Sequence, residues 1–378
     1  MAHLAEDVTS TFGASTTILT PSVSSNTETV RESQSSEDHV TDVRTRPTGP
    51  LPITLQDVYA WREQYPPIGQ FAVTESREFV AAGPDGLFSF QQVTDHASMP
   101  WSEARPLPLI GALNNISVTG IAIGSERDGN GLVAVYCVAG GALYGFWKDL
   151  MPDSRYAVYS NPPLAGYRVS GTPALAVDSF RHHTSKWYLV VPCQTGGLLV
   201  STVRSLETII LGATNWARVD HVATNLGLIS SVSAVVAPTT TNPYPRDLAM
   251  LRGDPPSYEE TSTRIQHPGE VTGNLGLAYS DSKRHMDLLV PSAEGGILHF
   301  VRTSSMPDEW HMIARIMFPP TVPAASCISL VVNSGSNPRT IRVYAQCGGV
   351  LYQISTSEGA KPWVGSHLRA ISGPGPSF

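Results

Sequence analysis

The residues that could do chemistry in this sequence form none of the spaced motifs on which common enzyme classes depend. The 378 residues contain no G-x-S-x-G turn for a nucleophilic serine, no glycine-rich phosphate loop and no H-E-x-x-H motif. His182 and His183 follow Arg181, but neighbouring residues on a strand point to opposite faces, which disfavours a shared metal ion. The sequence therefore predicts no metal site and no cofactor.

Acid–base chemistry by two carboxylates stays open at this stage. Glycoside hydrolysis needs two carboxyl groups about 5 to 9 Å apart. The candidates are Glu259, Glu260, Glu270 and Glu294. Positions along the chain do not give the separation of their side chains in space.

Glycine-centred hairpins are the elements that must position any functional side chains. An apolar run, a tight turn with glycine and a second alternating run recur about every 55 residues. The turn glycines are Gly86, Gly141, Gly197, Gly296 and Gly349. The interval from Gly197 to Gly296 is nearly double, so one copy has lost its glycine pair. Residues 246–254 are the candidate for this degenerate copy.

Six segments rich in Gly, Ala, Ser and Val precede the hairpins, and they suit strands that converge where space is least. They begin at Gly69, Ser117, Ser170, Ser230, Val271 and Ser326. An aromatic residue that follows each hairpin is expected to pack between sheets, at Trp101, Tyr156, Trp216, Trp310 and Trp363. The pattern predicts an all-β fold, a six-bladed β-propeller.

Composition sets the limits of this domain. Hydrophobic residues make up 41% of the chain and charged residues 15%, with 32 Gly and 30 Pro, which is a turn-rich β profile. Residues 1–50 are rich in Ser, Thr and Glu, so we expect a disordered leader followed by one propeller domain at 51–378. No secretory signal or membrane span is evident, which favours a cytoplasmic protein.

Charge and cysteine content exclude two further classes. A net charge of -7 argues against a nucleic-acid surface, which needs a concentrated basic face. The four cysteines are Cys137, Cys193, Cys327 and Cys347, and three of them stand just before turn glycines. We interpret them as small buried residues rather than as a redox or metal centre.

In a propeller, the entries to the inner strands and the turns of the middle hairpins share one rim of the central channel. Polar residues at those positions are therefore the predicted binding residues. On the strand entries these are Gln70, Thr119, Thr172, Ser231 and Asn274, on the turns they are Gln194, Glu294 and Gln346, and Tyr144 is a candidate for an apolar wall.

The phrases SGTPALAV, YLVVPCQTGGLLVS and LLVPSAEGGILHFVR, each followed by a tryptophan, resemble those of fungal lectin-like six-bladed propellers. With the short leader, the overall plan over about residues 52–378 resembles the fungal hetero-Diels-Alderases of tropolonic sesquiterpene biosynthesis. The similarity rests on blade pattern, length and leader rather than on an active-site motif.

This resemblance implies a pericyclase of secondary metabolism that needs no cofactor and takes small apolar substrates. A tropolone quinone methide would add to a humulene-type sesquiterpene and form the dihydropyran of a meroterpenoid. Proximity of the two partners would supply much of the acceleration. Arg168 or His299 would act as the catalytic donor near the tropolone oxygen.

The alternative is a carbohydrate-binding propeller of the fucose-lectin type. Such lectins use an Arg, a Glu and an aromatic residue in every blade to hold a sugar between blades. Here Arg-Val-Tyr occurs once, from Arg342 to Tyr344, so a set of equivalent sugar sites is not evident. A third hypothesis is a scaffold whose rim binds a protein partner, of which the sequence gives no identity.

Overall fold

The structure is a computed structural model, and it describes the backbone of a little over half of the chain. No α-helix occurs among the described residues, and therefore none there is long and apolar enough to cross a membrane. The described residues are 14–18, 41–44, 46–47, 69–83, 86–91, 102, 104–108, 117–125, 131–149, 154–159, 164, 166–178, 186–203, 219–224, 227–236, 251–252, 259–260, 270–280, 285–303, 306–333, 340–357, 363 and 367–370.

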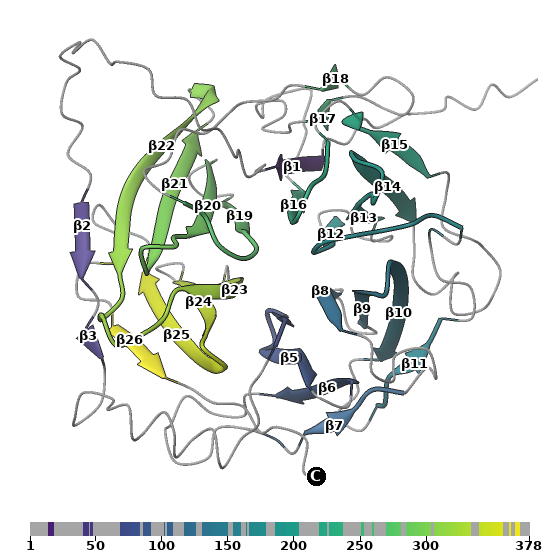
Figure 1. Cartoon of the computed structure of the whole chain (residues 1–378), viewed down its shortest axis with the longest axis horizontal. Helices are drawn as coiled ribbons and strands as arrows, with labels where there is room; N and C mark the ends of the chain where they lie inside the picture. The colour runs from purple at the N-terminus through teal and green to yellow at the C-terminus, as the bar shows by residue number, and fades with distance from the viewer. Residues whose placement is uncertain are drawn as a thin grey trace, which may run out of the picture.

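The strands form sheets arranged radially around an axis, which is the architecture of a β-propeller (Figure 1). Five sheets have the regular order of a blade, in which an inner strand, a middle hairpin and an outer strand follow one another along the chain. A sixth sheet completes the ring, and its strands do not all follow one another along the chain. The prediction of an all-β propeller is confirmed.

Blades 1, 2 and 3 each consist of four consecutive antiparallel strands. Their middle hairpins turn at glycines with positive φ, for example Gly140 at 58° and Gly141 at 77°, a conformation that other residues rarely adopt. Blade 1 contains β4 (Phe71–Val73), β5 (Glu78–Gly83), β6 (Gly86–Gln91) and β7 (Arg105–Pro106). Blade 2 contains β8 (Val118–Ser125), β9 (Leu132–Ala139), β10 (Ala142–Asp149) and β11 (Ala157–Val158). Blade 3 contains β12 (Ala174–Asp178), β13 (Lys186–Pro192), β14 (Leu198–Val203) and β15 (Asp220–Val222).

Blades 4 and 5 have the same order and the longest strands. Blade 4 contains β19 (Gly276–Ser280), β20 (His285–Pro291), β21 (Ile297–Thr303) and β22 (Met306–Met317). Blade 5 contains β23 (Ala325–Asn333), β24 (Thr340–Cys347), β25 (Val350–Ser357) and β26 (His367–Ala370).

The sixth sheet lies between blades 3 and 4 and corrects the prediction of six regular blades. It is here named the β16 sheet, and only its inner strand β16 (Val232–Val236) resembles its counterparts. The other members are β1 (Ala14–Ile18), β17 (Leu251–Arg252) and β18 (Glu259–Glu260). Strand β17 falls in the degenerate copy, which lacks the glycine pair that a tight middle hairpin requires. The blade count is therefore five, with an irregular sheet at the sixth position.

Residues 1–50, which the sequence predicts to be a disordered leader, contribute three short strands to the sheets. Strand β1 pairs antiparallel with β16, while β2 (Thr41–Arg44) and β3 (Arg46–Pro47) pair parallel with β22 and β26. Strand addition uses backbone hydrogen bonds and needs no hydrophobic pattern, so composition does not reveal it. The division at residue 50 stays a prediction.

Close backbone contacts join the inner strands around the axis. The Thr172 N–H donates to the Ser230 carbonyl at 3.0 Å, which joins blade 3 to the β16 sheet. Blade 5 meets blade 1 where the Val73 N–H donates to Ser329 Oγ at 3.3 Å. A Cβ added to Gly273 of blade 4 would lie 2.6 Å from the Ser326 carbonyl oxygen of blade 5. The small residues predicted for the innermost strands are therefore required by this approach.

Apolar side chains fill the spaces between neighbouring sheets, so the core is divided among the blade interfaces. Phe79 of blade 1 packs edge-on against Tyr344 of blade 5, with ring centroids 4.9 Å apart. Trp363, fully buried, lies in the cluster between blades 4 and 5. Tyr156 and Trp310 also pack against buried clusters, whereas Trp101 and Trp216 lie outside the described residues.

We predict that a methyl group at Gly273 destabilises the ring more than one at Gly295. Both glycines have positive φ, 64° and 91°, so Ala at either position pays about 1–2 kcal/mol for its backbone conformation. Only at Gly273 does the new Cβ meet the backbone of the next blade, whereas Gly295 has nothing within 4 Å. Gly273→Ala should therefore cost about 1–3 kcal/mol more than Gly295→Ala in urea unfolding. Equal stabilities would show that the inner strands tolerate wider spacing.

Candidate functional site

The entry of each inner strand lies beside the turn of the middle hairpin in the same blade. Val169 bridges Cys193 in blade 3, and Val271 bridges Ser292 in blade 4. We name this side of the ring the turn-side rim, defined by the hairpin turns at 139–142, 193–197, 292–296 and 347–350 and the strand entries beside them. The prediction that entries and turns share one rim is confirmed.

Two predicted residues, Arg168 and Gln194, meet on this rim at the boundary between blades 2 and 3. The Val169 N–H donates to the Gly141 carbonyl at 3.1 Å, and the Gln194 N–H donates to the Arg168 carbonyl at 3.0 Å. These bonds hold both residues against the turn of blade 2. Arg168 Nη1 lies 3.6 Å, and Gln194 Oε1 3.8 Å, from the position that a Cβ on Gly141 would occupy.

The polar groups of this pair are available to a ligand. Both side chains are exposed, and no hydrogen bond or ion pair within the described part of the chain engages the guanidinium of Arg168 or the side-chain amide of Gln194. Two of the exposed large apolar side chains stand at strand entries on the same rim, Tyr167 next to Arg168 at 44% exposed, and Leu228 before β16 at 68% exposed. Leu228 follows Gly227, whose carbonyl accepts the Gly197 N–H in the turn of blade 3. We name Gly141, Arg168 and Gln194, flanked by Tyr167 and Leu228, the rim site.

Three other predicted residues lie at the axis and are occupied with joining inner strands. Thr172 and Ser231 form a parallel bridge, and both are buried. The side-chain amide of Asn274 donates to the Ile328 carbonyl at 2.8 Å and accepts the Ile328 N–H at 2.6 Å. The backbone of Thr172 and Ser231 and the side-chain amide of Asn274 thus join neighbouring inner strands, a role that sequence alone does not distinguish from a ligand contact.

A cavity of about 130 Å³ runs along the axis between these strands. The inner strands of all five blades and of the β16 sheet contribute to its wall. Thr172 and Asn274 belong to this lining, but most of the lining residues are apolar, for example Phe71, Ile121 and Leu275. The axis is thus narrow, and although most of its lining residues have apolar side chains, polar atoms make up most of the surface that faces the cavity.

The remaining predicted binding residues are spread over blades 1, 2, 4 and 5 and do not meet in one pocket. The Gln70 carbonyl accepts the Ala82 N–H at 2.8 Å, and Thr119 Oγ1 donates to the Val138 carbonyl at 3.2 Å. Tyr144 packs against the apolar cluster between blades 1 and 2. Glu294 pairs with Arg315, and Gln346 accepts the hydroxyl of Ser326.

His299, the second predicted donor, is buried in the body of blade 4 rather than on the rim. The Trp363 indole N–H donates to His299 Nδ1 at 2.8 Å, and His299 Nε2 lies 2.9 Å from Asp287 Oδ1. An indole nitrogen only donates, so Nδ1 must accept and Nε2 carries the proton given to Asp287. The hydrogen bond between His299 and Trp363 links blade 4 to blade 5. His299 is 1% exposed, so it lies in the interior, away from the exposed Arg168.

Asp287 is the charged centre of this buried network. His285 Nε2 lies 3.1 Å from its second carboxylate oxygen. Burial acts to raise the pKa of Asp287, but the side-chain hydrogen bonds from His285 and His299 outweigh it and hold the pKa below its ordinary value. The carboxylate stays ionised and fixes the orientation of His299.

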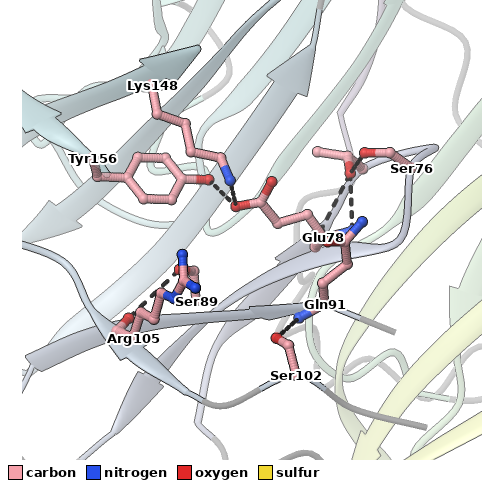
Figure 2. Close-up of polar contacts among 9 residues, drawn as sticks. Ser76, Glu78, Ser89, Gln91, Ser102, Arg105, Lys148 and Tyr156 are labelled. Carbon is pink, nitrogen blue, oxygen red and sulfur yellow. Dashed lines mark hydrogen bonds and ion pairs between the residues drawn. The ribbon is translucent and has the colours of Figure 1, made fainter. Parts of the chain in front are cut away.

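A second buried network, which the sequence did not reveal, joins blades 1 and 2 (Figure 2). Glu78 Oε1 accepts the Tyr156 hydroxyl at 2.7 Å and lies 2.7 Å from Lys148 Nζ. Burial, together with the charge and hydrogen bond of Glu78, holds the pKa of Tyr156 well above its ordinary value, so the phenol remains a neutral donor. The cluster lies at the end of β5 away from the turn-side rim. Only the aromatic position of Tyr156 was visible in the sequence.

The described residues contain no group of three or more His, Cys, Asp or Glu that could hold a metal ion. The four cysteines are free and buried, and burial raises the pKa of Cys137, Cys327 and Cys347 to about 12. The side chains of His182, His183, Glu259 and Glu260 lie outside the described residues. Of the four candidate glutamates, Glu270 and Glu294 are described, and both are exposed on the rim of blade 4.

Comparison with solved structures finds propellers with the same plan. A mutant of the Aleuria aurantia lectin in complex with α-methyl-L-fucoside superposes with a TM-score of 0.52 and 10% identity, over 82% of this chain and 95% of the lectin. The fucose-specific lectin from Aleuria aurantia in its mercury-derivative form gives 0.52 and 11%, over 82% and 97%. AofleA from Arthrobotrys oligospora gives 0.52 and 12%, over 82% and 88%.

The fold is that of a fucose-lectin-like β-propeller. At these identities the likeness establishes architecture and no more. No protein-family model matches the sequence, and no curated protein is similar to it in sequence. The fungal lectin-like resemblance of the blade phrases is confirmed at the level of fold, while assignment of a function depends on the rim site and the axial cavity.

We predict that Lys148 is needed mainly to compensate Glu78. Replacing Lys148 by Met leaves a carboxylate that is 6% exposed without its cation, which should lower the free energy of unfolding by about 3–5 kcal/mol. In the double variant Glu78→Gln with Lys148→Met, a neutral amide can still accept the Tyr156 hydroxyl, and most of that loss should be recovered. Urea unfolding measures both. A double variant no more stable than Lys148→Met would contradict this account.

We predict an acid-dependent contribution from Asp287. A carboxyl whose pKa is lower in the folded state than its ordinary 3.8 stabilises the fold above that pH, and the contribution declines as pH falls further. Asp287→Asn should therefore cost about 2–3 kcal/mol at pH 7, with a smaller difference from wild type at pH 2.5. Unfolding midpoints of both proteins between pH 2.5 and pH 7 test the prediction. A difference in stability between Asp287→Asn and wild type that does not change with pH would refute it. Asp220→Asn, a half-buried position outside this network, is the control.

Proposed function

We propose that this protein is a carbohydrate-binding propeller whose ligand binds at the rim site. The observation that carries the proposal is the meeting of Arg168 and Gln194 over the glycine turn of the neighbouring blade, where both are exposed and their side chains have no partner among the described residues. A guanidinium offers five donors, and an amide adds two donors and an acceptor. Such groups match the hydroxyls of a sugar, and the flanking apolar side chains suit the carbon face of its ring.

The fold supports this proposal through its neighbours. One of these structures is a fucose-specific lectin, and another is a lectin mutant in complex with α-methyl-L-fucoside. Sugar binding is thus a use to which this architecture is put. Extending it to this chain is our inference, because the sequences are about 10–12% identical.

The hetero-Diels-Alderase hypothesis gains no support from the axis. Joining a tropolone quinone methide to a humulene-type terpene requires a chamber for both, and drug-sized ligand pockets are about 300–1,000 Å³. The axial cavity is about 130 Å³. Arg168 and His299 also occupy separate environments, one on the rim and one in the interior. Small apolar substrates at the axis are therefore not proposed.

The rim positions differ from blade to blade, which favours few sites over a repeated set. Gln194 and Ala293 occupy equivalent turn positions, because their N–H groups donate to the carbonyls of Arg168 and Glu270 respectively. Blade 4 therefore presents Glu270 where blade 3 presents Arg168. A ligand that needs both a guanidinium and an amide finds them together at the blade 2–3 boundary.

We predict that the full chain binds glycans on an array and that the rim site accounts for the binding. Calorimetry with a glycan selected from the array should give a stoichiometry near one. Arg168→Gln and Gln194→Ala should each weaken binding by about tenfold, since each removes hydrogen bonds worth about 1–1.5 kcal/mol or more. Arg155→Gln, an exposed arginine elsewhere on blade 2, controls for net charge. Binding to no glycan, or equal affinity in all variants, would reject the proposal.

A further inference from the structure

The rim site of blades 2 and 3 carries a positive charge that no acidic side chain in the described part of the chain neutralises. The turn of blade 2, at 139–142, and the turn of blade 3, at 193–197, contain no acidic residue. The Arg168 guanidinium has no ion pair within the described residues. In a chain with a net charge of -7, an exposed arginine held in this way is a distinctive local feature.

Blade 4 shows the contrasting arrangement at the same structural position. The N–H of Gly196 donates to the Cys193 carbonyl, and that of Gly295 donates to the Ser292 carbonyl. Thr195 of blade 3 and Glu294 of blade 4 therefore occupy the same place in their turns. Glu294 pairs with Arg315 on the outer strand of its own blade, so this arginine, which does not occupy the position of Arg168, is neutralised within the blade.

The geometry around Arg168 suits a carboxylate. Gly141 has φ of 77° and no side chain, and a Cβ at this position would stand within 4 Å of both Arg168 Nη1 and Gln194 Oε1. A ligand atom in that space can contact the guanidinium and the amide together. Arginine binds carboxylates through two parallel N–H donors, with stronger bonds than those to a neutral hydroxyl.

We infer that the rim site prefers a glycan whose terminal sugar carries a carboxylate, such as a uronic acid residue. This inference rests on the proposed function, since it names the ligand class of the same site. The carboxylate pairs with Arg168, a ring hydroxyl bonds to Gln194, and the apolar face of the sugar lies toward Tyr167 or Leu228. The uncompensated arginine thereby acquires its partner from the ligand.

The test compares a methyl glucuronide with its methyl ester, which has the same ring and hydroxyls but no charge. Calorimetry or saturation-transfer NMR on the full chain should show the acid binding about fivefold tighter than the ester, as expected for a partly exposed ion pair. The preference should shrink in 0.5 M NaCl, because exposed charges are screened there. Arg168→Gln should bring the ratio of affinities to one, while Arg155→Gln should leave it unchanged.

The outcomes separate this inference from the proposed function. If α-methyl-L-fucoside or the ester binds as tightly as the acid, and Arg168→Gln weakens all of them equally, carbohydrate binding stands and the carboxylate preference is wrong. If the preference for the acid persists in Arg168→Gln, the positive charge that binds the carboxylate lies elsewhere, and the inference is overturned. If no sugar binds, both are rejected. Circular dichroism of each variant verifies that the propeller is intact.

Discussion

The close approach of the inner strands at the axis is the constraint on which the rest of this structure depends. Sheets that radiate from a common axis bring their first strands together, and the space left for side chains is least there. Gly120 illustrates the limit, because a Cβ at this position would meet the backbone of Gly171 at 2.9 Å. A residue whose Cβ faces the neighbouring inner strand at close range must therefore be small, or its side chain must bond to that strand. Asn274 does the latter, with both atoms of its amide paired to Ile328.

Away from the axis the sheets diverge, and larger groups fill the wedges between them. Most of the filling is apolar, but two interfaces contain charged networks, one around Glu78 and one around Asp287. Each network satisfies its buried carboxylate with cationic or hydrogen-bonding groups, and each includes an aromatic donor from beyond the middle hairpin. A buried ion pair contributes little net stability, but it disfavours any arrangement in which its members separate. These networks therefore specify how blades 1 and 2, and blades 4 and 5, are aligned.

Much of the architecture could be predicted from the sequence because it depends on local rules. Glycines such as Gly141 and Gly197 mark hairpins since few other residues adopt their φ, and the small-residue phrases identify inner strands by the same steric argument. The β16 sheet could not be predicted, because its second strand, β1, comes from more than 200 residues away in the sequence. Backbone pairing of that kind leaves no periodic trace in composition.

The candidate site was harder to predict because a polar residue at a strand entry has two uses that look alike in sequence. Arg168 and Asn274 both stand beside an inner strand, yet one is exposed and unpaired in the described chain while the other is bonded across blades. The network of Glu78 with Tyr156 joins residues 78 positions apart, a distance over which spacing carries no information. The role of His299 likewise depends on its hydrogen bonds to Trp363 and Asp287, which only the structure gives.

The same steric limit that builds the ring also moves the binding site outward. A ring closed by backbone contacts leaves about 130 Å³ at its centre, and widening it would break bonds such as that between Thr172 and Ser230. At the rim no such limit operates, because the strand entries and turns end there in solvent. Side chains at the rim can therefore differ between blades without disturbing the packing, as Arg168 and Glu270 do. Recognition chemistry is free to vary at the rim because stability is determined at the axis and between the sheets.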